Sequence, residues 1–274
     1  MENRSKEELI KKGVTVLKSF IDKKYCLNLK DMITNSRKKS GNKFYSSEKE
    51  FKKYSRFTKC NPDLKFNYLN HFEHKYLDQK ILSAVPGKII SKKIVWNVNK
   101  KFLPKWLRKY EKYLIGNINP YIKKKFQDET HFYGVYIHPD ILTGHKETFI
   151  TAYLYLDRVK KENSPIYVFE KSHQLGLSKF PVYIKKFNKD YLYINEDKTM
   201  FTKKKTITGN SGDLILFDGR CLHSTDYNIS TSQRVSIRYL VQPHNKLKEF
   251  NGRMKHFTFG LKGDHMQLVG MFNK

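Results

Sequence analysis

The chain has 274 residues, of which 39% are hydrophobic and 14% aromatic, a composition that fits a folded globular protein and excludes a disordered one. Lysine and arginine number 54 against 26 acidic residues, a formal net charge of +28. Such an excess attracts nucleic acid, anionic lipid or acidic small molecules, but we expect most of the lysines to form a solvated surface, because no basic helix or aromatic-interleaved RNA-binding signature accompanies them.

The first 130 residues are predicted to be largely helical. Residues 6–12 resemble a short charged helix, 14–17 a strand after Gly13, and the spacing of apolar residues predicts a helix from Asp22 to about Ser36. Beyond Ser36 lysines, aromatic residues and short apolar patches alternate without a clear period. A helix around 105–115 is the best local prediction there.

From His131 the pattern changes to short strands separated by turns. Strands are predicted at 131–138, 148–156, 166–169, 213–217 and 234–241, and the lysine-rich residues 179–205 are predicted to be an excursion outside the core. This order indicates a mainly β protein with flanking helices, in which a helical region of about 1–130 packs on a jelly-roll core of about 131–245. Without an internal repeat or linker, 1–274 is expected to be a single domain.

Cysteine usage and the N-terminus indicate the compartment. The three cysteines (Cys26, Cys60 and Cys221) are odd in number and show no CxxC spacing, which argues against a disulfide framework and a thiolate zinc site. The chain starts with polar residues, and no apolar run reaches 18 residues. We therefore expect a cytoplasmic protein with no membrane segment.

Pairs of a histidine and an acid two residues later are candidate metal ligands. A non-haem iron(II) oxygenase binds its metal with two imidazoles and one carboxylate, and a His-x-Asp pair at a strand end places both side chains on one face. With 10 histidines and 26 acids, chance alone predicts about one such pair, and the chain has three: His71/Glu73, His138/Asp140 and His145/Glu147. His138/Asp140 is favoured because it lies where a predicted strand ends.

A second segment, 212–223, adds specificity to this choice. It consists of a predicted strand and a tight turn that delivers His223, and Arg234 opens another strand eleven residues later. A buried arginine can hold the distal carboxylate of a dicarboxylic acid through two charge-assisted hydrogen bonds. A plain core histidine is the competing interpretation of His223.

Two of these segments resemble the phytanoyl-CoA dioxygenase family. Residues 155–176 are similar to its "LDD-x-x-x-ENGPL-x-x-x-PGSH-x-x-G" segment, and 212–239 to its distal-histidine and arginine segment in residues and spacing. Residues 13–21 resemble its usual opening. In this chain Glu170 and Lys171 replace the usual Pro-Gly, and the loop after Asp140 is shorter than expected.

The resemblance implies a double-stranded β-helix, a cupin-like jelly roll, that uses iron(II) as cofactor and 2-oxoglutarate as co-substrate. Carried over residue by residue, it makes His138, Asp140 and His223 the metal ligands and catalytic residues. Arg234 then pairs with the C5 carboxylate of 2-oxoglutarate.

Further pocket residues follow from the same resemblance or from strand parity. Thr225 resembles a family hydroxyl that helps to hold the co-substrate, and Tyr153 an aromatic residue that lines the pocket. Tyr136 shares parity with His138 and is either a pocket or a core tyrosine. Arg238 shares a face with Arg234, and an interstrand role is as compatible with its position as a site role. His173 is expected to be structural.

The family's chemistry consumes O2 and 2-oxoglutarate and releases succinate and CO2. Halogenating relatives carry a small residue at the position of Asp140, so its carboxylate favours hydroxylation. We expect a dioxygenase that hydroxylates a small organic substrate, and the basic surplus favours an anionic one. Two alternatives stay open: an oxygenase acting on nucleic acid, with steeply salt-dependent affinity, and a non-catalytic jelly-roll binding protein. The sequence does not indicate the oligomeric state.

Overall fold

The computed structural model describes residues 3–39, 74–97, 132–133, 135–140, 149–178, 183–225, 230–232 and 234–244. Three α-helices lie in this part of the chain: α1 (Asn3–Lys12), α2 (Lys23–Lys39) and α5 (Lys75–Ala84). A short 3-10 helix, η2, spans Ser172–Leu175. None of these helices has both the length and the apolar character needed to span a bilayer.

Five strands form the larger sheet, in the order β1-β11-β5-β13-β2, and neighbouring strands pair antiparallel. They are β1 (Val14–Leu17), β11 (Leu214–Asp218), β5 (Ile150–Tyr155), β13 (Arg234–Pro243) and β2 (Gly87–Asn97). Because β13 is held by β5 on one side and β2 on the other, its backbone is fixed along nearly its whole length.

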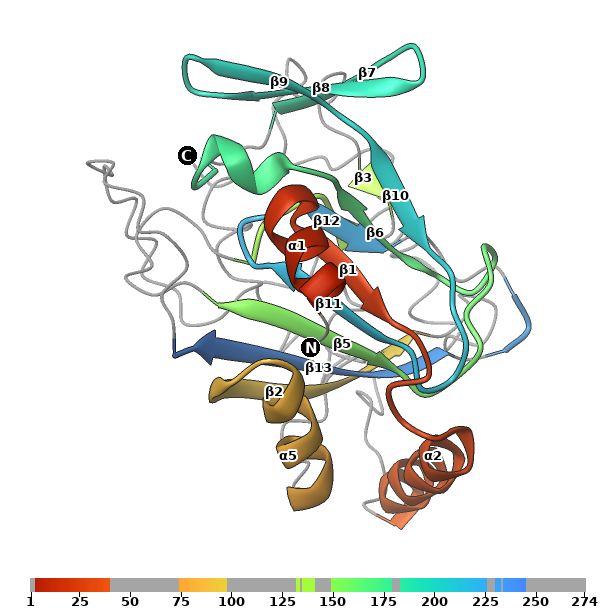
Figure 1. The fold of residues 1–274 in the computed structure, drawn as a ribbon. Helices are drawn as coiled ribbons and strands as arrows, with labels where there is room; N and C mark the ends of the chain where they lie inside the picture. The colour runs from red at the N-terminus through yellow and green to blue at the C-terminus, as the bar shows by residue number, and fades with distance from the viewer. Residues whose placement is uncertain are drawn as a thin grey trace, which may run out of the picture.

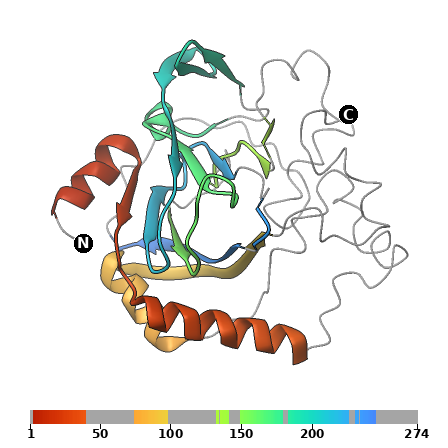
Figure 2. The ribbon, with the colours of Figure 1, turned by 90° about the vertical axis from the view of Figure 1, so that its right-hand side faces the viewer.

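A smaller sheet faces the larger one, with the order β10-β6-β12. It consists of β10 (Lys204–Ile207), β6 (Ile166–Phe169) and β12 (His223–Thr225). Beyond β12, His138 forms an isolated antiparallel bridge with His223. Figures 1 and 2 show the two sheets stacked, with α2 and α5 below the larger sheet.

Apolar side chains fill the space between the two sheets at one end. Alternate residues of a strand point to opposite faces, so the inner face of the larger sheet contributes one set and the smaller sheet the other. The cluster consists of Val14, Val95, Tyr153, Tyr155, Val159, Ile166, Val168, Ile207, Ile215, Phe217 and Cys221. This arrangement confirms the predicted mainly β fold with a double-stranded β-helix core.

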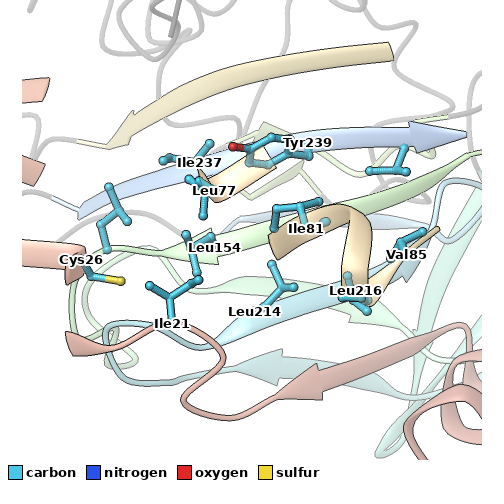
Figure 3. Packing of buried hydrophobic residues seen from close by; sticks show 14 of the residues in the cluster. Ile21, Cys26, Leu77, Ile81, Val85, Leu154, Leu214, Leu216, Ile237 and Tyr239 are labelled. Atoms are coloured by element: carbon cyan, nitrogen blue, oxygen red, sulfur yellow. The ribbon is translucent and has the colours of Figure 1, made fainter. Parts of the chain in front are cut away.

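Two helices cover the outer face of the larger sheet (Figure 3). The buried residues of α2 (Cys26, Leu29 and Ile33) follow a helical spacing of three to four, as do Leu77, Ile81 and Ala84 of α5. They pack against outward-facing residues of the strands, among them Leu154, Leu214, Leu216, Ile237 and Tyr239. This layer shields the back of the sheet whose front face carries the candidate site.

The lysine-rich excursion contains more regular structure than predicted. Strands β7 (Tyr183–Phe187), β8 (Asp190–Asn195) and β9 (Lys198–Thr202) form an antiparallel meander, seen at the top of Figure 1. Ile184 and Tyr193 anchor the meander on the outward-facing Tyr167 and Phe169 of β6. The predicted limit at Lys205 is wrong, because β10 is a strand of the core.

Two other expectations need correction. The strand predicted at 131–138 is broken into β3 (Phe132–Tyr133) and β4 (Val135–Tyr136), which pair antiparallel with each other. The strand predicted at 14–17 is confirmed as β1, but the expected helical region of about 1–130 also contributes β2, which was not predicted, to the larger sheet. The helix predicted around 105–115 lies outside the described residues, and the single-domain organisation stays a prediction.

Two turns adopt a left-handed backbone at positions where the family segment has glycine. Ser164 has φ 62° and Lys171 has φ 66°, a conformation that costs a residue with a Cβ about 1–2 kcal/mol. The Lys171 amide nevertheless donates to the Lys12 carbonyl at 2.7 Å, which ties the end of α1 to the turn after β6. Tertiary contacts therefore stabilise the left-handed backbone that a glycine would adopt without strain.

We expect Lys171→Gly to raise the free energy of unfolding by about 0.5–1 kcal/mol, because relief of the left-handed strain exceeds the extra chain entropy of glycine. Urea denaturation measures this difference. The matched control is Lys185→Gly in β7. Lys185 does not have a positive φ, so glycine relieves no strain there and should destabilise the protein. An unchanged or lower stability of K171G would contradict the strain argument.

Candidate metal centre

Three candidate ligands converge beside β12, the edge strand of the smaller sheet: His138, Asp140 and His223. One ligand atom of each lies within 4.8 Å of the others. His138 Nε2 is 3.9 Å from Asp140 Oδ1, and His223 Nε2 is 3.7 Å from Asp140 Oδ2. Two imidazoles and a carboxylate at these separations can share one ion, and this donor set suits non-haem iron(II).

Backbone pairing sets the positions of the two histidines. The amide of each donates to the carbonyl of the other, at 3.1 and 3.0 Å, so the two residues are directly opposite across the bridge. On the other side His223 is opposite Val168 of β6. The Ser172 hydroxyl accepts from the Leu222 amide at 2.9 Å and donates to the Phe169 carbonyl. These bonds fix the strand that presents His223.

The His223 ring is held in a form suited to metal binding. Its Nδ1 lies 3.0 Å from the Cys221 carbonyl and can donate to it, which leaves the lone pair of Nε2 directed to the site. The Phe217 ring packs against it at a centroid distance of 4.6 Å. Burial lowers the pKa of His223 to about 4, although Asp140 opposes this shift, so the imidazole is neutral at pH 7.

Asp140 has a partner for each carboxylate oxygen. The Thr151 hydroxyl donates to Oδ2 at 2.5 Å, and Arg238 Nη1 donates to Oδ1 at 3.2 Å. Burial alone would raise the pKa of Asp140, but the attraction of Arg238, with smaller contributions from the two histidines and the Thr151 hydroxyl, lowers it below its ordinary range. Asp140 is therefore an anion at pH 7.

Arg234 is fully buried, at 0% exposure, on the inner face of β13. Its Nη1 donates to the Ser164 carbonyl and its Nη2 to the Tyr153 hydroxyl at 3.0 Å, whereas Nε has no hydrogen-bond partner in the part of the chain that the structure describes. Among the described residues no carboxylate forms an ion pair with it. A buried guanidinium without an anion is costly unless a ligand supplies one, so the arrangement fits the distal carboxylate of a dicarboxylic acid.

The other predicted pocket residues are placed less completely. Tyr153 is buried and contacts Arg234, as expected for a residue that lines the pocket. Thr225 lies on the same face of β12 as His223, and within the described part of the chain its hydroxyl has no hydrogen-bond partner. The backbone of Tyr136 belongs to β4, but its side chain lies outside what the structure describes.

The competing metal pairs, His71/Glu73 and His145/Glu147, also lie outside the described residues. His173 is buried away from the triad, with Nε2 3.1 Å from the Ile10 carbonyl. The sequence prediction missed Thr151 as a partner of Asp140 and left Arg238 undecided. Strand parity was the available signal, because both residues share an inner face with a predicted site residue, Tyr153 or Arg234.

Several solved structures are similar to this chain. One is the non-heme alpha ketoglutarate dependent carbocyclase SnoK from nogalamycin biosynthesis (13% identity, 89% of this chain, 84% of that chain, TM-score 0.49). Another is the epimerase SnoN from the same biosynthesis (12%, 88%, 81%, TM-score 0.47). A third is AviO1 from Streptomyces viridochromogenes Tue57 (11%, 89%, 96%, TM-score 0.47). No curated protein sequence matches the chain.

The family comparison covers most of the chain. The family model described as phytanoyl-CoA dioxygenase (PhyH) matches residues 10–236, a range that includes the triad and Arg234. The expected cofactor and co-substrate, iron(II) and 2-oxoglutarate, are confirmed by this match together with the His-Asp-His triad. The chain belongs to the phytanoyl-CoA dioxygenase family of iron(II)- and 2-oxoglutarate-dependent oxygenases.

Proposed function

We propose that this protein is a dioxygenase that hydroxylates a small anionic organic molecule and releases succinate and CO2. One observation carries the proposal: two imidazoles and a carboxylate converge beside a barrel interior that also holds a buried arginine, to which the described residues supply no anionic partner. A binding protein without chemistry has no need for either feature.

His138, Asp140 and His223 would hold the iron. When bound, iron(II) and 2-oxoglutarate supply the oxidation: O2 is consumed, 2-oxoglutarate becomes succinate and CO2, and one oxygen atom is available for a substrate C–H bond. The protein contributes donors in the right protonation state. His223 is neutral and Asp140 ionised at pH 7, so neither has to lose a proton to the solvent before it binds the metal.

Arg234 and Tyr153 would bind the C5 carboxylate of 2-oxoglutarate. The guanidinium is directed by two existing hydrogen bonds, to the Ser164 carbonyl and the Tyr153 hydroxyl, and its Nε remains available. A planar guanidinium with a free N–H matches a carboxylate in geometry and charge. Thr225, on the same strand face as His223, is the proposed hydroxyl contact of the co-substrate.

The apolar cluster between the sheets excludes water from this end of the barrel. Ile166 and Val168 of β6 share a face with Thr225 and His223, and Phe217 lies against the His223 ring. A dry wall strengthens the attraction between Arg234 and a bound carboxylate, because the local dielectric constant is low. It also protects the oxidising step from side reactions with water.

The buried charges favour an anionic substrate. Among the described side chains at the site, Asp140 carries one negative charge and Arg234 and Arg238 one positive charge each. Iron(II) adds two positive charges and 2-oxoglutarate two negative ones, so one positive charge stays uncompensated. Burying an unbalanced charge is unfavourable, and a substrate with one negative group would remove the imbalance.

Asp140 also bears on the type of reaction. A carboxylate at this position fills the third protein ligand site, whereas a small residue would leave room for a halide ion. Hydroxylation is therefore the proposed outcome. Product mass identifies it, since a hydroxylated product gains one oxygen atom, and this atom comes from O2 and not from water.

Our first functional prediction concerns turnover. The iron(II)-loaded protein should release succinate from 2-oxoglutarate, even slowly without substrate, and Asp140→Ala or His223→Ala should reduce this release to the level of metal-free protein. Succinate is measured by mass spectrometry under air, with an anaerobic sample as control. Unchanged turnover in both variants would refute the assignment of the triad.

A second prediction isolates the role of Arg234. With Mn(II) present, 2-oxoglutarate at 100 times its wild-type Kd should stabilise the wild type by about 2.7 kcal/mol. At the same concentration Arg234→Met should lose most of this stabilisation. Without ligand, the variant should unfold at a similar or higher temperature than the wild type, because an unpaired buried cation has been removed. Thermal denaturation measures both. Pyruvate, which lacks the C5 carboxylate, is the control ligand and should stabilise both proteins equally; a full 2-oxoglutarate response in R234M would exclude this role.

A third prediction concerns the substrate. In a screen of small molecules matched in size, those with one carboxylate, phosphonate or sulfonate group should stimulate succinate release more strongly than their neutral amides or esters. Stimulation by neutral compounds alone would contradict the charge argument, and stimulation only by oligonucleotides would favour the nucleic-acid alternative.

A further inference from the structure

We propose that Arg238, together with Thr151, is a positioning residue that fixes the orientation of Asp140 for metal binding. The inference rests on the proposed function, because it assumes that Asp140 is a metal ligand. It goes further in assigning a role to a guanidinium that neither binds the co-substrate nor serves as a ligand.

The contacts divide the carboxylate between two partners. Arg238 Nη1 lies 3.2 Å from Oδ1 and the Thr151 hydroxyl 2.5 Å from Oδ2. The side chains of Asp140 and Arg238 are 2% and 8% exposed, and Thr151 is fully buried, so water does not replace these partners. The same two oxygens are those nearest His138 Nε2 and His223 Nε2.

An unsupported aspartate would not be held in this way. The terminal torsion of an aspartate side chain has a broad, two-fold energy profile, and the structure places no residue of β5 or β13 other than Thr151 and Arg238 in hydrogen bonds to this carboxylate. Thr151 and Arg238 belong to adjacent strands on one sheet face, because Arg238 is opposite Tyr153, two residues from Thr151. The rigid sheet therefore defines the plane of the carboxylate.

The same strand also carries the co-substrate anchor. Arg234 and Arg238 are four residues apart on the inner face of β13, which corresponds to roughly 13 Å along a strand. Because β5 and β2 flank β13, the two guanidiniums cannot shift independently. One strand thus fixes both ends of the site, the ligand carboxylate through Arg238 and the proposed C5 carboxylate position through Arg234.

Charge and orientation predict opposite effects of removing Arg238. A guanidinium repels a divalent cation, so a purely electrostatic role predicts tighter metal binding after its removal. A positioning role predicts weaker binding, because a freed carboxylate must be reoriented when the metal binds. Loss of partners that orient metal ligands typically lowers metal affinity about 10–100-fold.

The test measures Mn(II) affinity by calorimetry and the visible absorption spectrum of the Co(II)-loaded protein, both independent of turnover. We expect Arg238→Met to bind Mn(II) about 10–100-fold more weakly than wild type and to show an altered Co(II) spectrum. Thr151→Val, which removes the other partner, should weaken binding in the same direction, and it carries the test if R238M does not fold. Affinity in either folded variant equal to or above that of wild type would overturn the proposal.

Tyr239→Phe is the matched control. Tyr239 neighbours Arg238 on β13 but points to the opposite face, where its hydroxyl donates to Asp78 at 2.9 Å. This variant should have lower thermal stability and unchanged Mn(II) affinity. An equal loss of affinity in Y239F and R238M would overturn the positioning role, since the loss would then reflect the stability of the strand.

Asp140→Ala separates the two proposals. If it binds Mn(II) as well as wild type does, the proposed metal site fails, whereas a defect in D140A without one in R238M removes only the present inference.

Discussion

The buried carboxylate of Asp140 is the interaction on which the site depends. It lies within 4 Å of two imidazole nitrogens, accepts a hydrogen bond from Thr151 and pairs with Arg238, so residues from four separate segments meet at one negative charge. Burial of such a charge is unfavourable unless its partners compensate for it. Here the partners keep the carboxylate ionised, which is the form that binds a metal.

The fold holds these segments together through backbone pairing, not through the site itself. His138 and His223 exchange two backbone hydrogen bonds, and Thr151 and Arg238 belong to adjacent strands of a sheet whose back is covered by α2 and α5. The apolar cluster between the sheets includes Tyr153, which contacts Arg234, and Phe217, which packs on the His223 ring. The dry core therefore borders the candidate site directly.

The sequence predicted the parts of the site that are local. Strand β6 is a short run of β-branched and aromatic residues, the turn before His223 contains Asp218 and Gly219, and Arg234 follows at a spacing that the family shares. Helix α5 was missed because its N-cap is His74, an uncommon capping residue whose ring accepts from the Leu77 amide. Strand β2 was missed because its lysines interrupt the apolar pattern, as is common on an edge strand.

The contact between Arg238 and Asp140 joins residues 98 positions apart and depends on register, which composition and periodicity do not encode.

The central claim is that one metal and one keto-diacid share the space between the triad and Arg234. An anaerobic titration of the iron(II)-loaded protein with 2-oxoglutarate tests it most directly, because chelation of iron(II) by the keto acid produces a visible charge-transfer absorption. We predict that this absorption develops to one equivalent of 2-oxoglutarate and disappears in a His223→Ala variant. A flat spectrum in the wild type, or an unchanged absorption in the variant, would contradict the account.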